Sequence, residues 1–347
     1  MTSDEDHPND PDLPHRGIRL YADMNRVLSA ANTEKGWTPG RKTTVKDRWY
    51  SMPDVVKFYP LDFSDLTEDF SALVERNLLA DLVPIPKLFT HESVLLTFGS
   101  CFATNIRKHM AALNRRTYNI HVPEGLNNTF SILSYIRWGL TGTDPSMGQW
   151  FTKDADGKIR HYFESTMADE AGAYTDLMSA DGFIFTFGMT EIWRDSQTGG
   201  VFWRGVPKEV FDANQHKFEN STFEQNRDNL LELYHLIRQH RPDVPIVFTV
   251  SPVTLGATFR GDAAMVSDCI SKSILRAAVD AVMRQNLPGL YYWPSFEIVR
   301  WFGAHLPRPT FTQFSAAPDG KIITDSSHVD EAVVEVAVRK FIEHAFA

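Results

Sequence analysis

Residues 93–103 read S-V-L-L-T-F-G-S-C-F-A, and they join an apolar run to a helical pattern through a glycine and a serine. A short apolar run that ends at a glycine is typical of a buried strand. The helical spacing that follows is carried by four apolar residues, Ala103, Ile106, Met110 and Leu113. The sequence therefore predicts a strand that ends at Gly99 and a helix that begins directly after Ser100.

The rest of the chain repeats this alternation. Further strands are predicted at residues 117–122, 181–187, 244–250 and 290–293. Further helices are predicted at residues 128–140, from 221 to just before 242, at 263–285 and at 333–345. Strands that alternate with helices predict a mostly parallel sheet covered on both faces. Such sheets bind ligands beyond the carboxyl ends of their strands, so functional residues are expected at that edge.

Two local signals add detail to this pattern. The stretch Gln197-Thr198-Gly199-Gly200 lies between Trp193 and Trp203, and its glycines predict a hairpin turn. Ser221 and Glu224 have the spacing of a capping box, which predicts a helix start at Ser221.

The chain is expected to have one main domain with an N-terminal extension. Residues 1–48 are rich in Asp, Pro and Asn with few apolar residues, which predicts a mobile start. Residues 49–90 are expected to pack on the main domain, because they hold aromatic stretches but only one helical pattern. Residues 91–347 are expected to form the catalytic domain.

Composition excludes several classes of protein. The 347 residues are 43% hydrophobic and 23% charged, which is ordinary globular composition, and 24 Phe and 8 Trp are enough to line a cleft as well as a core. A net charge of −9 argues against a nucleic-acid partner, and two cysteines make neither a disulfide framework nor a zinc quartet. With no apolar run of about 18 residues and no secretory signal, a cytoplasmic protein without a membrane partner is expected.

Ser100 is the first candidate for chemistry. It is predicted at the carboxyl edge of the sheet and at a helix N-terminus, where free backbone N–H groups could stabilise an oxyanion formed when a serine attacks an acyl carbon. The alternative is that Ser100 is only an N-cap, a position that serine favours.

Asp325 and His328 form the second candidate pair, just before the last predicted helix. The Asp325 carboxylate could accept the Nδ1–H of His328, leaving Nε2 to take a proton from a hydroxyl. The alternative is a solvated loop with a helix cap. Asp330 competes as the partner of His328, but it is expected in the first turn of that helix.

The motifs together resemble a known family. Gly99-Ser100-Cys101-Phe102-Ala103 reads GSCFA, the signature of the GSCFA family, which resembles SGNH or GDSL-like hydrolases. Four further stretches, expected to extend the match to about residues 91–345, are G-L-N-N-T-F-S at 125–131, F-T-F-G-M-T-E-I-W at 185–193, T-V-S-P-V at 249–253 and the closing Asp325-x-x-His328. The resemblance implies a three-layer α/β/α sandwich of SGNH-hydrolase type, which is flavodoxin-like, with a Ser100, His328 and Asp325 triad.

One block departs from the family that it resembles. SGNH hydrolases usually have Gly-x-Asn-Asp in the third block, and this chain has Gly188, Met189, Thr190 and Glu191 there. The oxyanion donor is therefore expected to be the backbone of Ser100 with Thr190, or with an amide from the second block. That second block contributes Gly125, Asn127 and Asn128 as candidate oxyanion or substrate residues.

Each of three further residues, Glu191, Cys101 and Cys269, has a structural role as well as a chemical one to consider. Glu191 is either a substrate contact or a structural residue paired with Arg194 or Arg204, and the structural role is favoured. Cys101 could compete with Ser100 as nucleophile, but cysteine is among the most buried residue types, so Cys101 and Cys269 are both expected in the core.

The function expected from these residues is that of a serine esterase of SGNH type. Its substrate would be a short acyl ester of a carbohydrate or a related small molecule. An O-acyltransferase with the same triad is one alternative, and a non-catalytic carbohydrate-binding protein with a Trp193 and Trp203 platform is another. No cofactor is expected, and the oligomeric state stays open.

Overall fold

The computed structural model describes residues 69–81, 86–99, 101–112, 117–119, 126–142, 148–149, 151–153, 156–161, 170–203, 205–306, 309–311, 313–316, 322–325 and 328–347. The chain divides into two compact units, Met1–Leu82 and Val83–Ala347. In the first unit, the described residues form helix α3, Phe70–Asn77, and a 3-10 turn, Leu79–Asp81. The predicted mobile extension, residues 1–48, lies outside the described residues.

The second unit is built on a five-stranded sheet in the order β11-β10-β6-β1-β2, and every neighbouring pair of strands is parallel. Its strands are β1 Leu95–Gly99, β2 Thr117–Asn119, β6 Gly182–Phe187, β10 Ile246–Val250 and β11 Leu290–Tyr292. This arrangement confirms the predicted parallel sheet, although β10 begins two residues later than the strand expected at 244–250. Residues 120–122 of the strand expected at 117–122 lie outside the described residues.

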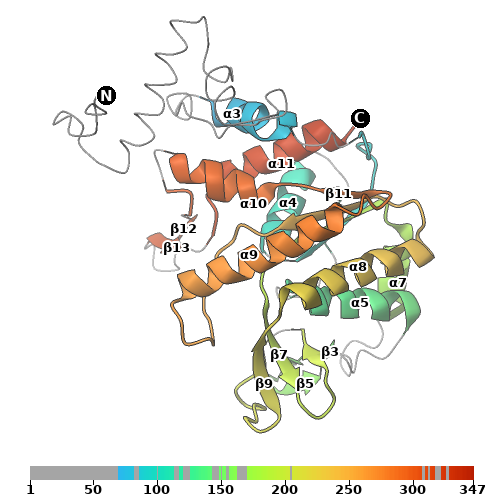
Figure 1. The fold of residues 1–347 in the computed structure, drawn as a ribbon, viewed down its shortest axis with the longest axis vertical. Helices are drawn as coiled ribbons and strands as arrows, with labels where there is room; N and C mark the ends of the chain where they lie inside the picture. Colours follow the sequence, from blue (N-terminus) through green and yellow to red (C-terminus); the bar gives the residue numbers. More distant parts are fainter. Residues whose placement is uncertain are drawn as a thin grey trace, which may run out of the picture. The chain divides into compact units, whose positions relative to one another are not determined.

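Helices cover both faces of the sheet, so the architecture is the expected α/β/α sandwich (Figure 1). One layer holds α5 Thr129–Thr141, α7 Glu170–Ser179, α8 Phe223–His240 and α9 Ala264–Met283. The other holds α4 Cys101–Ala112, α11 Glu331–Ala345, and the short α10 Ser295–Glu297 with its π and 3-10 continuation, Ile298–Phe302 and Gly303–His305. Among the described helices, none is long and apolar enough to cross a bilayer.

The alternation of side chains along β6 shows why the sheet is buried on both faces. Phe183, Phe185 and Phe187 point into the layer of α5, α7, α8 and α9, where they are at most 1% exposed. Ile184 and Thr186 alternate with them and are also buried, toward the side of α4 and α11. A strand that is apolar on both faces needs helices on both, which is the reason for the three layers.

The start of α8 differs from the prediction by one residue. The N-cap is Thr222, whose side chain accepts from the Gln225 backbone N–H, while the Gln225 side chain accepts from the Thr222 backbone N–H. The predicted box of Ser221 and Glu224 is therefore wrong. The Ser221 hydroxyl is fully buried, and it donates instead to the carbonyl oxygen of Thr190 at 2.9 Å.

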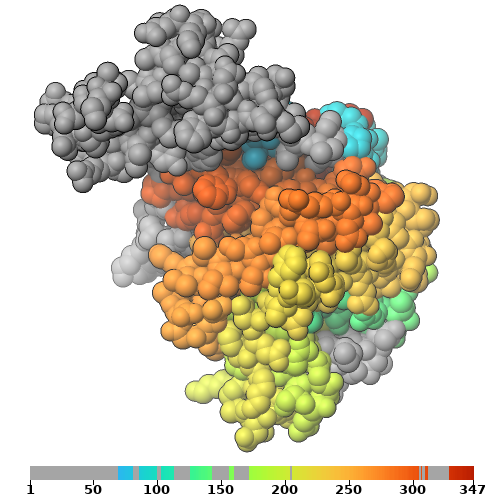
Figure 2. Space-filling model, viewed as in Figure 1, coloured from blue at the N-terminus to red at the C-terminus, as the bar shows by residue number. Residues whose placement is uncertain are grey.

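A second sheet follows directly from the carboxyl end of β6. Its order is β3-β8-β7-β9, and its strands are β3 Gly148–Gln149, β7 Glu191–Asp195, β8 Val201–Phe202 and β9 His216–Asn220. The turn between β7 and β8 confirms the predicted hairpin. Two small hairpins, β4 Phe151–Lys153 with β5 Ile159–His161 and β12 Gln313–Ala316 with β13 Ile322–Asp325, complete the described strands. Figure 2 shows β7 to β9 projecting beyond α8, so this sheet extends the carboxyl edge outward.

Candidate active site at the carboxyl edge of the sheet

The junction between β1 and α4 has the geometry that the sequence predicts. β1 ends at Gly99, which pairs with Thr186 of β6, and α4 begins at Cys101. Gly99 has a φ of +120°, and a Cβ there would lie 2.0 Å from the Thr186 carbonyl oxygen, so only glycine fits. Ser100, between these two elements in the chain, lies outside the described residues, and its role stays a prediction.

Helix α11 runs from the carboxyl edge of the sheet back to its amino edge. Its C-terminal neighbour Phe346 forms a bridge with Phe89, whose ring lies against Gly182 at the start of β6. The helix has 15 residues and is therefore about 22 Å long, which is enough to cross the sheet. The beginning of α11, with His328 just before it, therefore lies toward the same edge as the end of β1.

The three residues around the α11 start are only partly described. His328 is half-buried, and Asp325 ends β13, with its side chain outside the described set. Asp330 is the N-cap of α11, and its carboxylate accepts from the Ala332 backbone N–H at 3.1 Å. The expected hydrogen bonds of His328 with Ser100 and with Asp325 stay predictions, because they rest on atoms that are not described.

The second and third sequence blocks meet through their backbones. The carbonyl oxygen of Asn127 accepts from the N–H of Gly188 at 2.6 Å and from that of Met189 at 3.3 Å. The side chain of Asn128 caps α5 by accepting from the Ser131 N–H at 2.8 Å. Asn127 is not used in this way, and within the described part of the chain its buried Oδ1 has no hydrogen-bond partner. Gly125, also expected here, lies outside the described residues.

Thr190 stabilises this edge of the sheet through buried hydrogen bonds. Its side chain is fully buried, and its hydroxyl donates to Asn220 Oδ1 at 2.5 Å and lies 2.9 Å from Ser271 Oγ. A hydroxyl has a single proton, and here that proton is directed to Asn220. The expectation that Thr190 donates to an oxyanion is therefore not supported by this geometry.

Glu191 is buried, with 6% of its surface exposed, and its carboxylate accepts from Thr258 Oγ1 at 2.6 Å. The predicted pairing with Arg194 is wrong, because the Arg194 guanidinium binds Glu219 at 2.9 Å instead. Successive side chains of a strand point to opposite faces, and Arg194 is three residues from Glu191 on β7, so the two side chains lie on opposite faces. Arg204 lies outside the described residues.

A pocket of about 240 Å³ opens where the two sheets meet. Its lining includes Asn127, Met189, Glu191, Trp193, Trp203, Phe218 and Phe259. The aromatic residues come from β7, from the end of β8, from β9 and from the loop between β10 and α9. The aromatic residues that line this pocket thus account for part of the high aromatic content of the chain.

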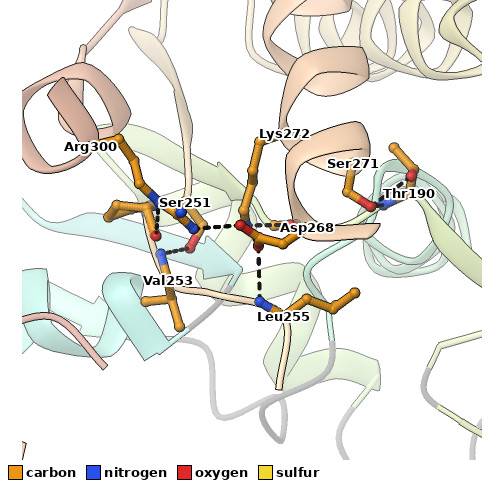
Figure 3. Close-up of polar contacts among 10 residues, drawn as sticks. Thr190, Ser251, Val253, Leu255, Asp268, Ser271, Lys272 and Arg300 are labelled. Atoms are coloured by element: carbon orange, nitrogen blue, oxygen red, sulfur yellow. Dashed lines mark hydrogen bonds and ion pairs between the residues drawn. The ribbon is translucent and has the colours of Figure 1, made fainter. Parts of the chain in front are cut away.

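An ionic cluster that was not expected from the sequence holds two loops of the same edge, and two of its three members, Asp268 and Lys272, are buried. Lys272 and Arg300 approach Asp268 from either side, with distances of 4.0 Å for the lysine and 2.7 Å for the arginine (Figure 3). Lys272 Nζ also donates to the Gly188 carbonyl oxygen at 2.5 Å, and Asp268 accepts from the Leu255 N–H at 2.9 Å. The cluster therefore ties the turn after β6 to the loop after β10.

One part of this cluster has a sequence signal. Asp268 and Lys272 are four residues apart in a predicted helix, which is the spacing of a helical ion pair. That spacing alone indicates a solvent-exposed pair, since charged residues usually lie on the surface. Arg300 is 32 residues further along the chain than Asp268, and no local pattern links the two.

Burial lowers the pKa of Lys272 from 10.5 to about 7, since a buried ammonium loses its hydration. The Asp268 carboxylate partly opposes this shift, and the Arg300 guanidinium adds to it. Between about pH 7 and 10.5, the unfolded chain carries a proton at Lys272 that the folded chain releases. The free energy of unfolding therefore rises with pH across this window, and the full cost of burying the ammonium applies below it.

We predict that Lys272→Met removes this pH dependence. The difference in unfolding free energy between the wild type and Lys272→Met should change by up to about 1.4 kcal/mol per pH unit in that window, in favour of the wild type at higher pH. Urea denaturation at several pH values measures it. Lys217→Met, at an exposed position of β9, is the matched control and should show no such slope. Parallel pH profiles for wild type and Lys272→Met would contradict the prediction.

The structure describes the side chain of Cys269 but not that of Cys101. Cys269 is exposed on α9, so the expectation that it lies in the core is wrong. The buried face of α9 is instead formed by residues that include Asp268, Ser271 and Lys272, which leaves position 269 toward solvent. Cys101 begins α4, but its side chain is not among those described, and its burial stays a prediction.

A comparison with known families settles what the signature indicates. A model of the GSCFA family matches residues 94–305, which is more than half of the chain. The chain belongs to the GSCFA family. The family match begins at β1 and includes the second and third blocks, the strand end at 249–253 and the Lys272 cluster. It ends before Asp325 and His328, short of the expected limit near residue 345. No curated protein matches this GSCFA chain.

Several solved structures are similar to the GSCFA chain at low identity. A putative GDSL-like lipase from Bacteroides ovatus ATCC 8483 is 12% identical with a TM-score of 0.34, over 73% of this chain and 52% of that one. The salicylyl-acyltransferase SsfX3 from a tetracycline biosynthetic pathway is 11% identical with a TM-score of 0.34, over 74% and 54% of the two chains. The GSCFA chain thus spans about half the length of these two proteins. These values are too low to transfer an activity.

Proposed function

We propose that this chain is a serine-dependent acyl-ester hydrolase of SGNH type with Ser100 as its nucleophile. The observation that carries the proposal is the junction between β1 and α4, where Gly99 lies against Thr186 and the next residue is a serine at a helix N-terminus. The direction of α11 supports it, because that helix begins on the side of the sheet where β1 ends. His328 and Asp325 complete the proposed triad.

In the proposed reaction, Ser100 Oγ attacks the acyl carbon while His328 Nε2 takes its proton. The C–O bond to the leaving alcohol then breaks, and His328 returns the proton to that alcohol. Water attacks the acyl-serine in a second round, with His328 again as base. The bond between the acyl carbon and Ser100 Oγ then breaks, His328 returns the proton to Oγ, and the acid is released. Asp325 orients His328 and stabilises its charged form.

The oxyanion formed in each round needs hydrogen-bond donors at a fixed position. Backbone N–H groups at the start of α4 would supply one donor. We assign the second to the Asn127 amide, because Asn128 is used as a helix cap and Thr190 donates to Asn220. Asn127 is joined to the turn at Gly188 by its own carbonyl oxygen, which holds it at this edge.

An O-acyltransferase is the second candidate function. The aromatic pocket beside Asn127 gives an alcohol acceptor a place to bind, and an acceptor bound there could resolve the acyl-serine in place of water. The aromatic wall also supports a small ring, such as that of a carbohydrate, as the part of the substrate or acceptor that binds. The two reactions share the same first step.

Labelling with a fluorophosphonate tests the shared first step. The wild type should be labelled on the tryptic peptide that contains Ser100, and Ser100→Ala should not be labelled. His328→Asn should be labelled much more slowly, because the hydroxyl loses its base. Absence of label on the wild type, or label that persists in Ser100→Ala, would refute the assignment.

A further inference from the structure

Among the described lining residues of the pocket between the two sheets, Glu191 is the one that presents a carboxylate, which accepts hydrogen bonds. Asn127 adds an amide, and Trp193 and Trp203 carry indole N–H groups, which are donors. None of the described lining residues is Lys, Arg or His.

Glu191 is the least expected of these groups. It is 94% buried, and within the described part of the chain its only hydrogen bond is the one from Thr258 Oγ1. A buried carboxylate is costly unless a positive charge accompanies it. The nearest arginine along β7, Arg194, is bound to Glu219 and to the Gly199 carbonyl oxygen. Among the described residues, none with a positive charge is bonded to Glu191, and Arg204 lies outside them.

The walls of the pocket suit a cation as well. Trp193, Phe218 and Phe259 form a cluster with ring centroids 5.0 to 5.7 Å apart, and Phe259 is 65% exposed. Faces of aromatic rings attract cations, and tryptophan does so most strongly. A neutral polyol would gain from the rings, but it would leave the Glu191 charge uncompensated.

We propose that this pocket binds a primary ammonium group, with Glu191 as its counter-charge. The carbon frame that carries the nitrogen lies against the rings of Trp193, Phe218 and Phe259. Aminated small molecules such as amino sugars have this combination of an ammonium and a compact frame.

The position of the pocket also indicates the class of substrate, and this inference rests on the proposed function. Asn127 belongs both to the pocket and to the proposed oxyanion site, so a ligand in the pocket lies next to the acyl carbon. The substrate class that follows is an acyl ester whose alcohol part carries an amine. An acylated amino sugar is the simplest member of this class.

Binding of glucosamine tests the pocket without reference to activity. Trp193 and Trp203, two of the eight tryptophans of the chain, line the pocket, so a ligand there should change the intrinsic fluorescence. Glucosamine at pH 6 is the cationic probe, with glucose and N-acetylglucosamine as neutral probes. We expect saturable quenching by glucosamine and little by the neutral sugars. Absence of saturable binding of glucosamine to the wild type would overturn the proposal. Equal binding of glucose and glucosamine would also overturn it.

Glu191→Gln removes the charge and keeps an oxygen that can accept from Thr258. It should raise the Kd of glucosamine about tenfold or more, because the ammonium loses its counter-charge. Glu219→Gln on the neighbouring strand β9 is the matched control and should change the Kd less than about twofold, since Glu219 is already paired with Arg194. An unchanged Kd in Glu191→Gln would refute the role of Glu191.

Isothermal calorimetry with the same two variants, after circular dichroism has shown that both are folded, repeats the measurement without a fluorescence readout. If Glu191→Gln does not fold, competition between glucosamine and the neutral sugars on the wild type decides the question. Fluorophosphonate labelling distinguishes the two proposals. Labelled Ser100 without glucosamine binding refutes the ammonium site alone, and glucosamine binding without a labelled Ser100 refutes the proposed reaction alone.

Discussion

Ser100→Ala is expected to lower the turnover of a short-chain aryl ester at least about a thousandfold, since losing the nucleophile removes the covalent step. Alanine removes only the hydroxyl and a helix cap worth about 1 kcal/mol, so the variant should remain folded. Initial rates with 4-nitrophenyl acetate at about pH 7.5 measure the effect, since a general base must be unprotonated to take a proton.

Cys101→Ser is the control for this experiment. It should keep most of the activity, because Ser100 is the proposed attacking group and Cys101 is expected to be buried. Activity that is lost in Cys101→Ser and kept in Ser100→Ala would mean that the thiol is the nucleophile. Activity that is kept in both variants would place the reaction elsewhere in the chain. If the wild type is silent on a simple ester, an activated acyl donor with sugar acceptors tests the transferase.

Gly99→Ala is expected to destabilise the fold by about 3 kcal/mol or more, through steric overlap and an unfavourable φ. The added Cβ would lie 2.0 Å from the Thr186 carbonyl oxygen, and both residues belong to paired central strands. The backbone at Gly99 has a φ of +120°, which alanine rarely adopts. Relief would require β1 to move away from β6, which would break the pairing at the end of the two strands.

Chemical denaturation with tryptophan fluorescence measures this loss. Gly256→Ala is the matched control, because a Cβ at Gly256 has no neighbour within 4 Å and the residue lies in an exposed loop. The control should shift the midpoint little. Equal midpoints for Gly99→Ala and Gly256→Ala would show that the junction between β1 and α4 tolerates a side chain, and would weaken the case for a closely built site at Ser100.

The layered fold could be predicted from local patterns. The run from Leu95 to Gly99 and the phenylalanines of residues 183–187 indicate buried strands because their side chains leave no polar face. The alternation of such runs with helical spacing then restricts the arrangement to a parallel sheet between two helix layers. The junction between this strand and the next helix could also be predicted, at Gly99 and Ser100. The strand, turn and helix preferences at that point depend on residues that are adjacent in the chain.

The partners of the buried polar side chains could not be predicted in this way. Thr190 was one of the alternatives for the oxyanion donor, but its hydroxyl binds Asn220. Asp268 pairs with an arginine 32 residues further along the chain. Cys269 was expected in the core and lies on the exposed side of α9. Each of these outcomes depends on which helix face meets which loop. Such contacts join residues that are far apart in the chain. The low dielectric of the packed interior makes unpaired polar groups costly and so determines which of them must pair, and local sequence preferences do not describe this effect.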